Sequence, residues 1–239
     1  MPILSLQSVS KSFGALKVTD AVSFDLAKGE ALGIIGPNGA GKSTLFNLIA
    51  GNVKPDQGRV FLDGRDVSSQ TAMQRCAAGI GRSFQIPQPF GHLTVYENLL
   101  VAARFGGAIS GHDAPEFCMD ILGRTGLAAQ ADKVSGALPL LQRKRLELAR
   151  AMATAPRVIL LDEIAGGLTE GECHELVATI RQIHAEGTAI IWIEHVLHAL
   201  NSVVERLMVL NFGKMLMIGE PAVVMASPEV REIYLGIEA

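Results

Sequence analysis

A glycine-rich segment lies between a short apolar run and a helical pattern, and its residue types are those that bind phosphate. In order, its residues are Gly36, Pro37, Asn38, Gly39, Ala40, Gly41, Lys42, Ser43 and Thr44. Residues 36–43 fit the pattern G-x-x-x-x-G-K-[ST]. Glycines let successive backbone N–H groups turn toward a β-phosphate, and the helix that follows adds its positive N-terminal end. The segment therefore predicts a loop that binds the phosphates of ATP.

Three side chains at the end of this loop have distinct predicted tasks. Lys42 would place a cation between the β- and γ-phosphates, Ser43 would offer its hydroxyl to Mg²⁺, and Thr44 would reach the α-phosphate. The alternative is a glycine turn that merely precedes a helix. The strand pattern before the loop and the helical pattern after it favour the phosphate site.

A second chemical signature is a pair of acids that ends a buried strand. Residues 158–161 are apolar, and Asp162 and Glu163 follow them. In proteins with such a phosphate loop, an aspartate at a strand end holds Mg²⁺, and we assign this task to Asp162. Glu163 would polarise the attacking water or accept its proton, with its side chain on the opposite face of the strand from Asp162. The alternative is a strand that simply leaves the core through two acids, and the phosphate loop disfavours it.

The elements that must position these residues alternate between strand and helix. Strand patterns cover Leu4–Val9 and Ala31–Ile35, and a helix follows the loop. Strand and helix patterns return at Arg157–Asp162, Gly171–Glu186, Thr188–Glu194 and Arg206–Leu210, and two short helices are predicted around Ser227 and Pro228. Between them, residues 86–155 read as a mainly helical insertion, with helices at Val95–Phe105, Ala114–Leu122 and Leu141–Ala153.

Composition limits the function classes. The chain has 239 residues, of which 49% are hydrophobic and 19% charged, as expected for one substantial α/β domain. A net charge of −3 gives no reason to expect nucleic acid as a partner. Three widely separated cysteines favour reduced thiols in a cytosolic protein. No apolar run approaches the roughly 18–20 residues of a membrane span, and the N-terminus lacks a secretory pattern, so a partner would have to supply any membrane association.

Together with further motifs, these residues resemble the ABC ATPase family over essentially the whole chain. Residues 82–85 (RSFQ) resemble the Q-loop, which implies that Gln85 approaches Mg²⁺ and the attacking water. His195 resembles the switch histidine that contacts the γ-phosphate, and Phe13 stands where the family places an aromatic ring on adenine. Residues 146–151 resemble the helix after the signature motif.

The resemblance implies a fold and an assembly. The fold is α/β: a P-loop NTPase (RecA-like) core from residues 1–85 and 156–239, with an N-terminal antiparallel β subdomain and an inserted helical subdomain, 86–155, within a single ABC ATPase domain, 1–239. The implied partners are transmembrane permease subunits, a second ATPase subunit and an extracytoplasmic solute-binding protein, with no nucleic acid. The chain would sit at the cytoplasmic face of the membrane, and part of Phe84–Leu100 would receive a short permease helix.

More narrowly, several stretches are similar to the ATPase subunits of branched-chain amino-acid importers. They are 36–47 (GPNGAGKSTLFN), 79–85, 93–98 (LTVYEN) and parts of 219–236. Related subunits serve urea, amides and other amino-acid-like or carboxylate solutes, so the implied solute is one of these classes.

The signature motif departs from the family pattern L-S-G-G-Q. Alignment with the following helix places it at residues 138–142 (LPLLQ), where Pro139 has neither hydroxyl nor N–H and Leu140 and Leu141 replace glycines. Ser135 and Gly136 lie upstream, but their use would require an insertion. In the family this loop caps the ATP of the partner subunit, so we favour a heterodimer with a distinct ATPase subunit. Ile164 also replaces the proline that often follows the catalytic acid.

Three questions remain open at this stage. A non-transport ABC ATPase is one alternative, although such proteins usually carry two cassettes or a long coiled coil. A nucleotide-binding subunit with weak hydrolysis in an asymmetric transporter is another, although Asp162, Glu163 and His195 are all present. The basic run 142–145 (QRKR) is either a solvated helix face or a contact near the opposite subunit's nucleotide.

Overall fold

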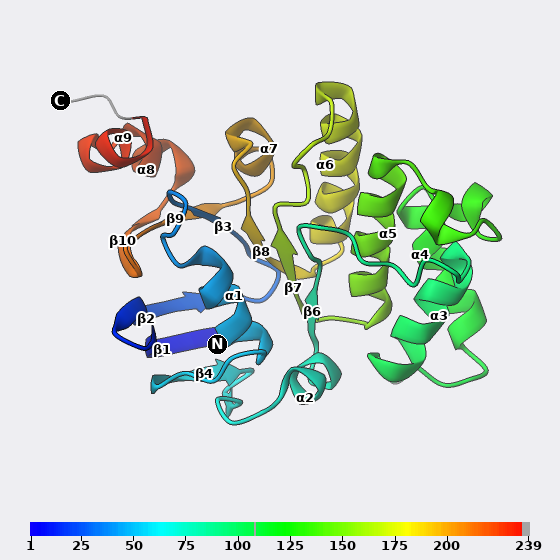
Figure 1. Ribbon diagram of the computed structural model, residues 1–239, viewed down its shortest axis with the longest axis horizontal. Coiled ribbons are helices and arrows are strands. Elements are labelled where there is room, and N and C mark those ends of the chain that lie inside the picture. Colours follow the sequence, from blue (N-terminus) through cyan, green and yellow to red (C-terminus); the bar gives the residue numbers. More distant parts are fainter. Residues whose placement is uncertain (108, 236–239) are drawn as a thin grey trace.

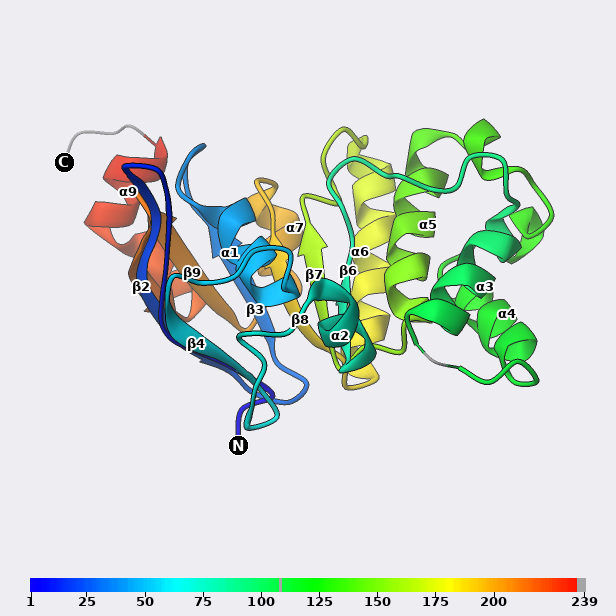
Figure 2. The same ribbon diagram turned by 60° about the horizontal axis from the view of Figure 1, so that its bottom comes forward.

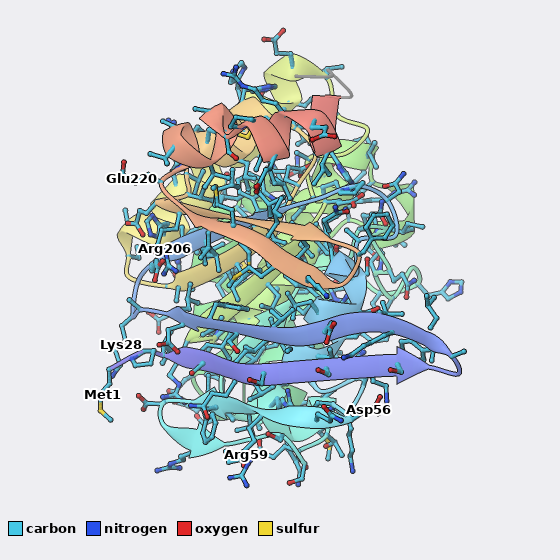
Figure 3. All side chains as sticks on the ribbon, turned by 90° about the vertical axis from the view of Figure 1, so that its left-hand side faces the viewer. Met1, Lys28, Asp56, Arg59, Arg206 and Glu220 are labelled. Carbon is cyan, nitrogen blue, oxygen red and sulfur yellow. The ribbon has the colours of Figure 1, made fainter. Side chains whose placement is uncertain are left out.

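A computed structural model of the chain describes residues 1–107 and 109–235, and it contains two β-sheets with helices packed around them (Figure 1). The first sheet is antiparallel, with the strand order β2-β1-β4-β5. Figure 3 looks onto its outer face, where β1 and β2 run side by side. Its strands are β1 (Leu4–Phe13), β2 (Leu16–Leu26), β4 (Gln57–Leu62) and β5 (Arg65–Asp66).

The second sheet is mainly parallel and has the order β10-β9-β3-β8-β7-β6. Only the edge strand β10 runs antiparallel to its neighbour. The strands are β3 (Ala31–Ile35), β6 (Ile80–Arg82), β7 (Val158–Asp162), β8 (Ala189–Ile193), β9 (Arg206–Asn211) and β10 (Lys214–Gly219). Because parallel strands end at the same edge, the loops after β3, β6, β7 and β8 meet there, which is where ligands bind in α/β sheets.

The central strands are buried on both faces, which explains their continuous apolar sequences. Alternate residues of β3, β7 and β8 belong to two different hydrophobic clusters, one on each side of the sheet. The cluster that includes Leu32, Leu160 and Ile191 also contains apolar residues of helix α1 (Lys42–Ala50) and of β1, β2 and β4. Helix α1 is therefore packed between the two sheets. Arg75 of α2 (Ala72–Ala77) closes the end of α1 by donating to the carbonyls of Leu48 and Ile49.

A helical region lies beside the sheets, on the right in Figures 1 and 2. It comes from the chain between β6 and β7 and contains α3 (Val95–Phe105), α4 (Ala114–Arg124), α5 (Leu140–Ala153) and the 3₁₀ turns Ala128–Gln130 and Ser135–Ala137. Apolar residues of α3, α4 and α5 belong to the same hydrophobic cluster as the second face of the parallel sheet. Helix α6 (Glu170–Ala185) and α7 (Leu197–Asn201) also pack on that face.

Comparison with the sequence shows which elements have strong local signals. The predictions for β3, α3, α5, α6 and the two final helices, α8 (Pro221–Ala226) and α9 (Pro228–Leu235), are confirmed to within two residues at each end. The short strand β6 and helix α2 lie in a stretch to which the sequence assigned no element. Their apolar residues are too few to form a period, and their positions depend on β7 and α1. Among the described residues, no helix is both long and apolar enough to cross a bilayer.

Candidate functional site

The predicted phosphate loop connects β3 to α1 at the carboxyl edge of the parallel sheet. Two of its glycines are required by the close approach of other backbone. Gly36 has φ 156° and a Cβ there would clash with the carbonyl of Leu210, whereas Gly41 has φ 100° and would clash with the carbonyl of Val18. The loop is therefore wedged between β9 and β2, and only glycine fits at these two positions.

Lys42 is buried, and its side chain folds back over the loop. Its Nζ donates to the carbonyl of Gly36 at 2.7 Å and to that of Pro37 at 3.1 Å. Burial lowers the pKa of Lys42, while the carboxylates of Glu163 and Asp162 oppose that shift. The lysine thus stands within electrostatic reach of both predicted acids. Ser43 is exposed and Thr44 is half-buried at the start of α1.

Asp162 ends β7 and is 7% exposed. Its carboxylate accepts a hydrogen bond from Arg82 of β6 at 3.0 Å, and the same guanidinium donates to Asn47 Oδ1 of α1 at 2.6 Å. Burial raises the pKa of Asp162, and Arg82 and Lys42 counteract this shift. Arg82 is therefore the counter-ion of Asp162, a partnership that the sequence did not reveal.

Gln85, Glu163 and His195 meet although they are far apart in the sequence. Gln85 Nε2 donates to one carboxylate oxygen of Glu163 at 2.5 Å, and His195 Nε2 lies 2.8 Å from the other. The second bond requires the His195 tautomer, or the cation, in which Nε2 carries the proton. The three residues follow β6, β7 and β8, so the parallel sheet itself brings them together.

The backbone at Glu163 differs from the expectation. β7 ends at Asp162. Glu163 has φ 45°, in the left-handed region that residues other than glycine rarely adopt. The prediction that Asp162 and Glu163 alternate as successive strand residues is therefore wrong. The turn is stabilised by the bond from the Glu163 N–H to the carbonyl of Ile193. Such backbone strain at a polar residue is typical of functional sites.

Glu194 is a second acid at the end of a buried strand, and the sequence analysis assigned it no task. It is 1% exposed, and its carboxylate accepts hydrogen bonds from the N–H groups of Ala165 at 3.0 Å and His195 at 2.9 Å. It thus joins the loop after Glu163 to the loop that carries His195. An acid directly after the apolar run 189–193 is the same signal that identified Asp162, and it could have been used.

Phe13 lies at the end of β1, opposite Leu16, and is 51% exposed. Lys11 Nζ lies 5.6 Å from the centre of the ring, and Asp56, labelled in Figure 3, accepts hydrogen bonds from Lys11 Nζ and the Ser12 N–H. The hairpin is close to the phosphate loop, because Val18 of β2 contacts Gly41. An exposed ring at this position is free to stack on a flat ligand.

Two hollows flank this edge of the sheet. A cleft of about 240 Å³ is lined by Gly36, Pro37, Asn38, His195 and Ile233, so it separates the phosphate loop from the His195 loop. A second cleft, of about 270 Å³, opens between the sheet and the helical region. Its lining includes Ile80, Arg82, Phe84, Ala102 and Arg150.

The segment predicted as the signature motif lies at the start of α5. Pro139 precedes the helix and provides no side-chain hydrogen bond to it, and Leu140 is 44% exposed. Ser135 is fully buried, donates to the carbonyl of Phe90 at 2.9 Å and accepts from Asn98. Its hydroxyl is therefore used inside the helical region, which supports the alignment of the motif with residues 138–142.

The basic run 142–145 is not a uniform helix face. Arg143 is exposed, but Lys144 is 3% exposed and donates to two backbone carbonyls. Neither prediction for the run, a solvated face or a contact with an opposite subunit, describes Lys144. A lysine between two arginines gives no signal of burial, so the sequence could not have identified it.

Taken as chemistry, this edge combines a cradle of backbone N–H groups, a lysine, two acids and a histidine. The N–H groups and Lys42 suit a polyphosphate. Glu163 can accept a proton, and His195 and Gln85 can hold the Glu163 carboxylate in one orientation. Such an arrangement fits phosphoryl transfer to water.

Comparison with known proteins supports this chemistry. A family model described as ABC transporter matches residues 19–166. The chain is 34% identical to the probable branched-chain amino acid transport ATP-binding protein LivG of Methanocaldococcus jannaschii, over 99% of this chain and 98% of that protein. It is also 32% identical to the lipopolysaccharide export system ATP-binding protein LptB of Haemophilus influenzae, over 99% of this chain and 98% of that one.

Among solved structures, the fold is similar to the ADP conformation of an ATP-binding cassette of an ABC transporter. The TM-score is 0.89 at 33% identity, covering 99% of this chain and 100% of that chain. The likeness therefore extends over both sheets and the helical region, and the cassette architecture predicted from the sequence is confirmed.

Proposed function

Because the chain belongs to the ABC transporter family and is one of its ATP-hydrolysing, ATP-binding subunits, we propose that it powers an importer of branched-chain amino acids or a related amino-acid-like or carboxylate solute. The observation that carries the ATPase role is the meeting of Gln85 and His195 on Glu163 beside the phosphate loop. The import direction and the solute class rest on similarity to LivG and on the motifs shared with such importers. Similarity to a lipopolysaccharide exporter subunit makes export the competing assignment.

The proposed reaction follows from the side chains at the sheet edge. Backbone N–H groups of residues 36–44 and Lys42 would hold the β- and γ-phosphates, and Phe13 would stack on adenine. Glu163 would take the proton of the attacking water as its oxygen bonds to the γ-phosphorus, while the bond from that phosphorus to the β–γ bridging oxygen breaks and ADP leaves. His195, which already shares a hydrogen bond with Glu163, would stabilise charge on the γ-phosphate.

The residues also fit Mg²⁺. Ser43, Asp162 and Gln85 offer a hydroxyl, a carboxylate and an amide oxygen, which are the hard donors that Mg²⁺ prefers. Gln85 uses its Nε2 on Glu163, so its amide oxygen is the atom that would turn to a cation. When bound, Mg²⁺ would neutralise charge on the phosphates. In this structure Arg82 supplies the positive charge at Asp162.

We also propose that the chain acts at the cytoplasmic face of a membrane, through permease subunits that dock at the cleft beside Phe84. Three features support this site. The cleft lies between the sheet and the helical region, Phe84 and nearby Ile86 are exposed apolar side chains, and the segment that carries them continues from Gln85. A permease helix seated there would press on the same segment that contacts Glu163.

One experiment tests the importer assignment. The tagged chain, purified in detergent from its source membranes, is expected to bring transmembrane permease subunits with it. In liposomes with the solute-binding protein, leucine or a related amino acid is expected to raise ATP hydrolysis and to accumulate on the side where ATP is hydrolysed. Glu116→Gln changes an exposed residue of α4. As the control variant, it is expected to give the same results as the unchanged chain. Stimulation by lipopolysaccharide, or a complex without membrane subunits, would contradict the importer.

For the second ATPase subunit, we propose a related but distinct chain. The support is the loop before α5, where Pro139 offers no donor and Leu140 exposes apolar bulk. If two copies of this chain paired, both sites would meet this poor cap, whereas a heterodimer would keep one good cap.

This proposal predicts a gain of activity. The triple change Pro139→Ser, Leu140→Gly and Leu141→Gly is expected to raise ATP hydrolysis by the purified chain alone by about tenfold or more, since one restored donor to a transition-state oxygen is worth about 10²-fold or more in other enzymes. The matched control replaces the same three residues by alanine and thus removes bulk without adding a hydroxyl. Equal rates for the two triple variants, measured as phosphate release, would contradict the proposal.

A further inference from the structure

Lys144 is a buried cation whose position has no explanation in packing alone. It lies in the first part of α5 and is 3% exposed, although its neighbour Arg143 faces solvent. Burying an ammonium group is unfavourable unless it finds hydrogen-bond acceptors and opposite charge. The groups that compensate Lys144 are therefore informative.

Its acceptors are the main chains of two proposed catalytic residues. Lys144 Nζ donates to the carbonyl of Gln85 at 2.7 Å and to the carbonyl of Glu163 at 3.3 Å. The side chains of these same two residues meet at 2.5 Å. Gln85 and Glu163 are thus joined twice, directly through their side chains and through Lys144 at their backbones, although 78 residues separate them in the chain.

The local charge agrees with this geometry. Four carboxylates, those of Glu194, Glu163, Glu147 and Asp162, act on Lys144 and oppose the lowering of its pKa by burial. Nearby carboxylates therefore offset part of the cost of burying this cation.

Helix α5 also holds the segment that follows Gln85. Glu147, one turn after Lys144, accepts from the Gln88 N–H at 3.3 Å, and Arg150 donates to the Gln88 carbonyl at 2.7 Å. These contacts fix residues 85–88 against α5. They do not reach Glu163, so Lys144 is the α5 side chain that connects both loops.

The need for such support is visible in the backbone of Glu163. Its φ of 45° is a conformation that persists only when the surroundings hold it. The carbonyl that Lys144 contacts belongs to this strained residue. That carbonyl also accepts from the Gly166 N–H at 3.3 Å within its own loop, so the Lys144 contact is the one that fastens it to α5.

We propose that Lys144 is a positioning residue for ATP hydrolysis: it ties Gln85 and Glu163 to α5 and so sets the orientation of the Glu163 carboxylate. It does not touch nucleotide. This inference rests on the proposed role of Glu163 as the group that activates water.

The test compares Lys144→Met with Lys144→Arg, which restores two N–H donors and the charge. In the detergent-purified complex, Lys144→Met is expected to lower kcat for ATP by about 100-fold, the loss that a displacement of about 1 Å causes, and to leave KM within about twofold. Lys144→Arg is expected to stay within about fivefold of the unchanged protein. Lys133→Met, at an exposed position of the chain, is the matched control.

Hydrogen exchange of the full chain supplies a readout that does not depend on turnover. Lys144→Met is expected to accelerate exchange in 83–90 and 162–168 while strands β3 and β9 keep their rates. Unchanged exchange in both segments would overturn the proposal. Acceleration spread evenly over the chain, without rescue by arginine, would equally overturn it, because that pattern denotes a general loss of stability.

The outcomes also separate this inference from the proposed function. If the unchanged complex fails to hydrolyse ATP, the proposed function is wrong, and hydrogen exchange still decides whether Lys144 fixes the two loops. If the unchanged complex is active and Lys144→Met matches it in kcat, only the role of Lys144 is wrong. Should the methionine variant not fold, Lys144→Gln replaces it. A kcat of Lys144→Gln equal to that of the unchanged protein would likewise show that the role of Lys144 is wrong.

Discussion

Replacing Glu163 by glutamine is expected to lower the rate of ATP hydrolysis by about 10²- to 10⁴-fold, the range that a positioned general base contributes. Glutamine keeps the size of the side chain and can still accept a hydrogen bond from His195 through its amide oxygen. It cannot take a proton from water. Because the Lys42 ammonium donates to the carbonyls of Gly36 and Pro37 rather than to Glu163, affinity for ATP should stay within about threefold.

The measurement is phosphate release by the assembled complex at saturating ATP, together with calorimetric titration of the isolated chain. Glu116→Gln removes a carboxylate of the same kind at an exposed position of α4 and is expected to change neither quantity. If Glu163→Gln kept more than about half of the original rate in the complex, another group would have to activate the water.

The sequence predicts this site well where a residue type is tied to a strand end. The apolar runs that became β3, β7 and β8 are short and fully buried; the glycine-rich loop follows β3, and an acid follows each of the other two directly. Parallel pairing then places those residues at one edge without any further information. Lys42 and Glu163 could therefore be grouped before any contact was known, whereas His195 was assigned from its resemblance to the family's switch histidine.

The sequence predicts the site poorly where a side chain works through tertiary contacts alone. Lys144 lies in a basic run that the sequence interprets as a solvated face or as a contact near an opposite subunit's nucleotide, yet its acceptors come from two distant loops. Arg82 pairs with Asp162 only because β6 aligns with β7, and β6 is three residues long. Neither partnership leaves a local pattern, since each depends on packing between elements far apart in the chain.

The left-handed turn at Glu163 shows a related limit. Strand alternation predicts that side chains of Asp162 and Glu163 point to opposite faces, but the strand ends one residue earlier than this reasoning assumes. The Glu163 N–H bonds to the carbonyl of Ile193, and its own carbonyl accepts from Lys144. Tertiary hydrogen bonds thus override the local preference for an extended backbone.

Replacing Lys42 by alanine is expected to weaken the binding of Mg·ATP by about 10- to 150-fold. A hydrogen bond to a charged group contributes about 1.5–3 kcal/mol, and each 1.4 kcal/mol corresponds to about a tenfold change in affinity. Lys42 Nζ is positioned over the loop by the carbonyls of Gly36 and Pro37. Phosphate oxygens bound in the loop would therefore meet its charge without a rearrangement of the backbone.

The loss of affinity for ATP should include charge repulsion as well as the lost hydrogen bonds. Lys42 is also the cation that acts on Glu163 and Asp162 from the side of the loop. Its removal leaves these carboxylates facing the phosphates with less positive charge between them, so repulsion would add to the lost hydrogen bonds. Hydrolysis at saturating ATP should fall with affinity, because the same charge stabilises the γ-phosphate as the bond breaks.

Calorimetry of the purified chain with Mg²⁺ and ATP measures this effect directly. Lys54→Ala removes an exposed lysine just beyond α1 and is expected to bind as the unchanged protein does. Thermal unfolding without nucleotide distinguishes lost binding from lost folding, since the backbone of the loop is held by contacts with Leu210 and Val18 rather than by Lys42 alone. An affinity of Lys42→Ala within about threefold of the unchanged chain would mean that residues 36–44 do not hold the triphosphate, and the assignments of Glu163 and Lys144 would lose their substrate.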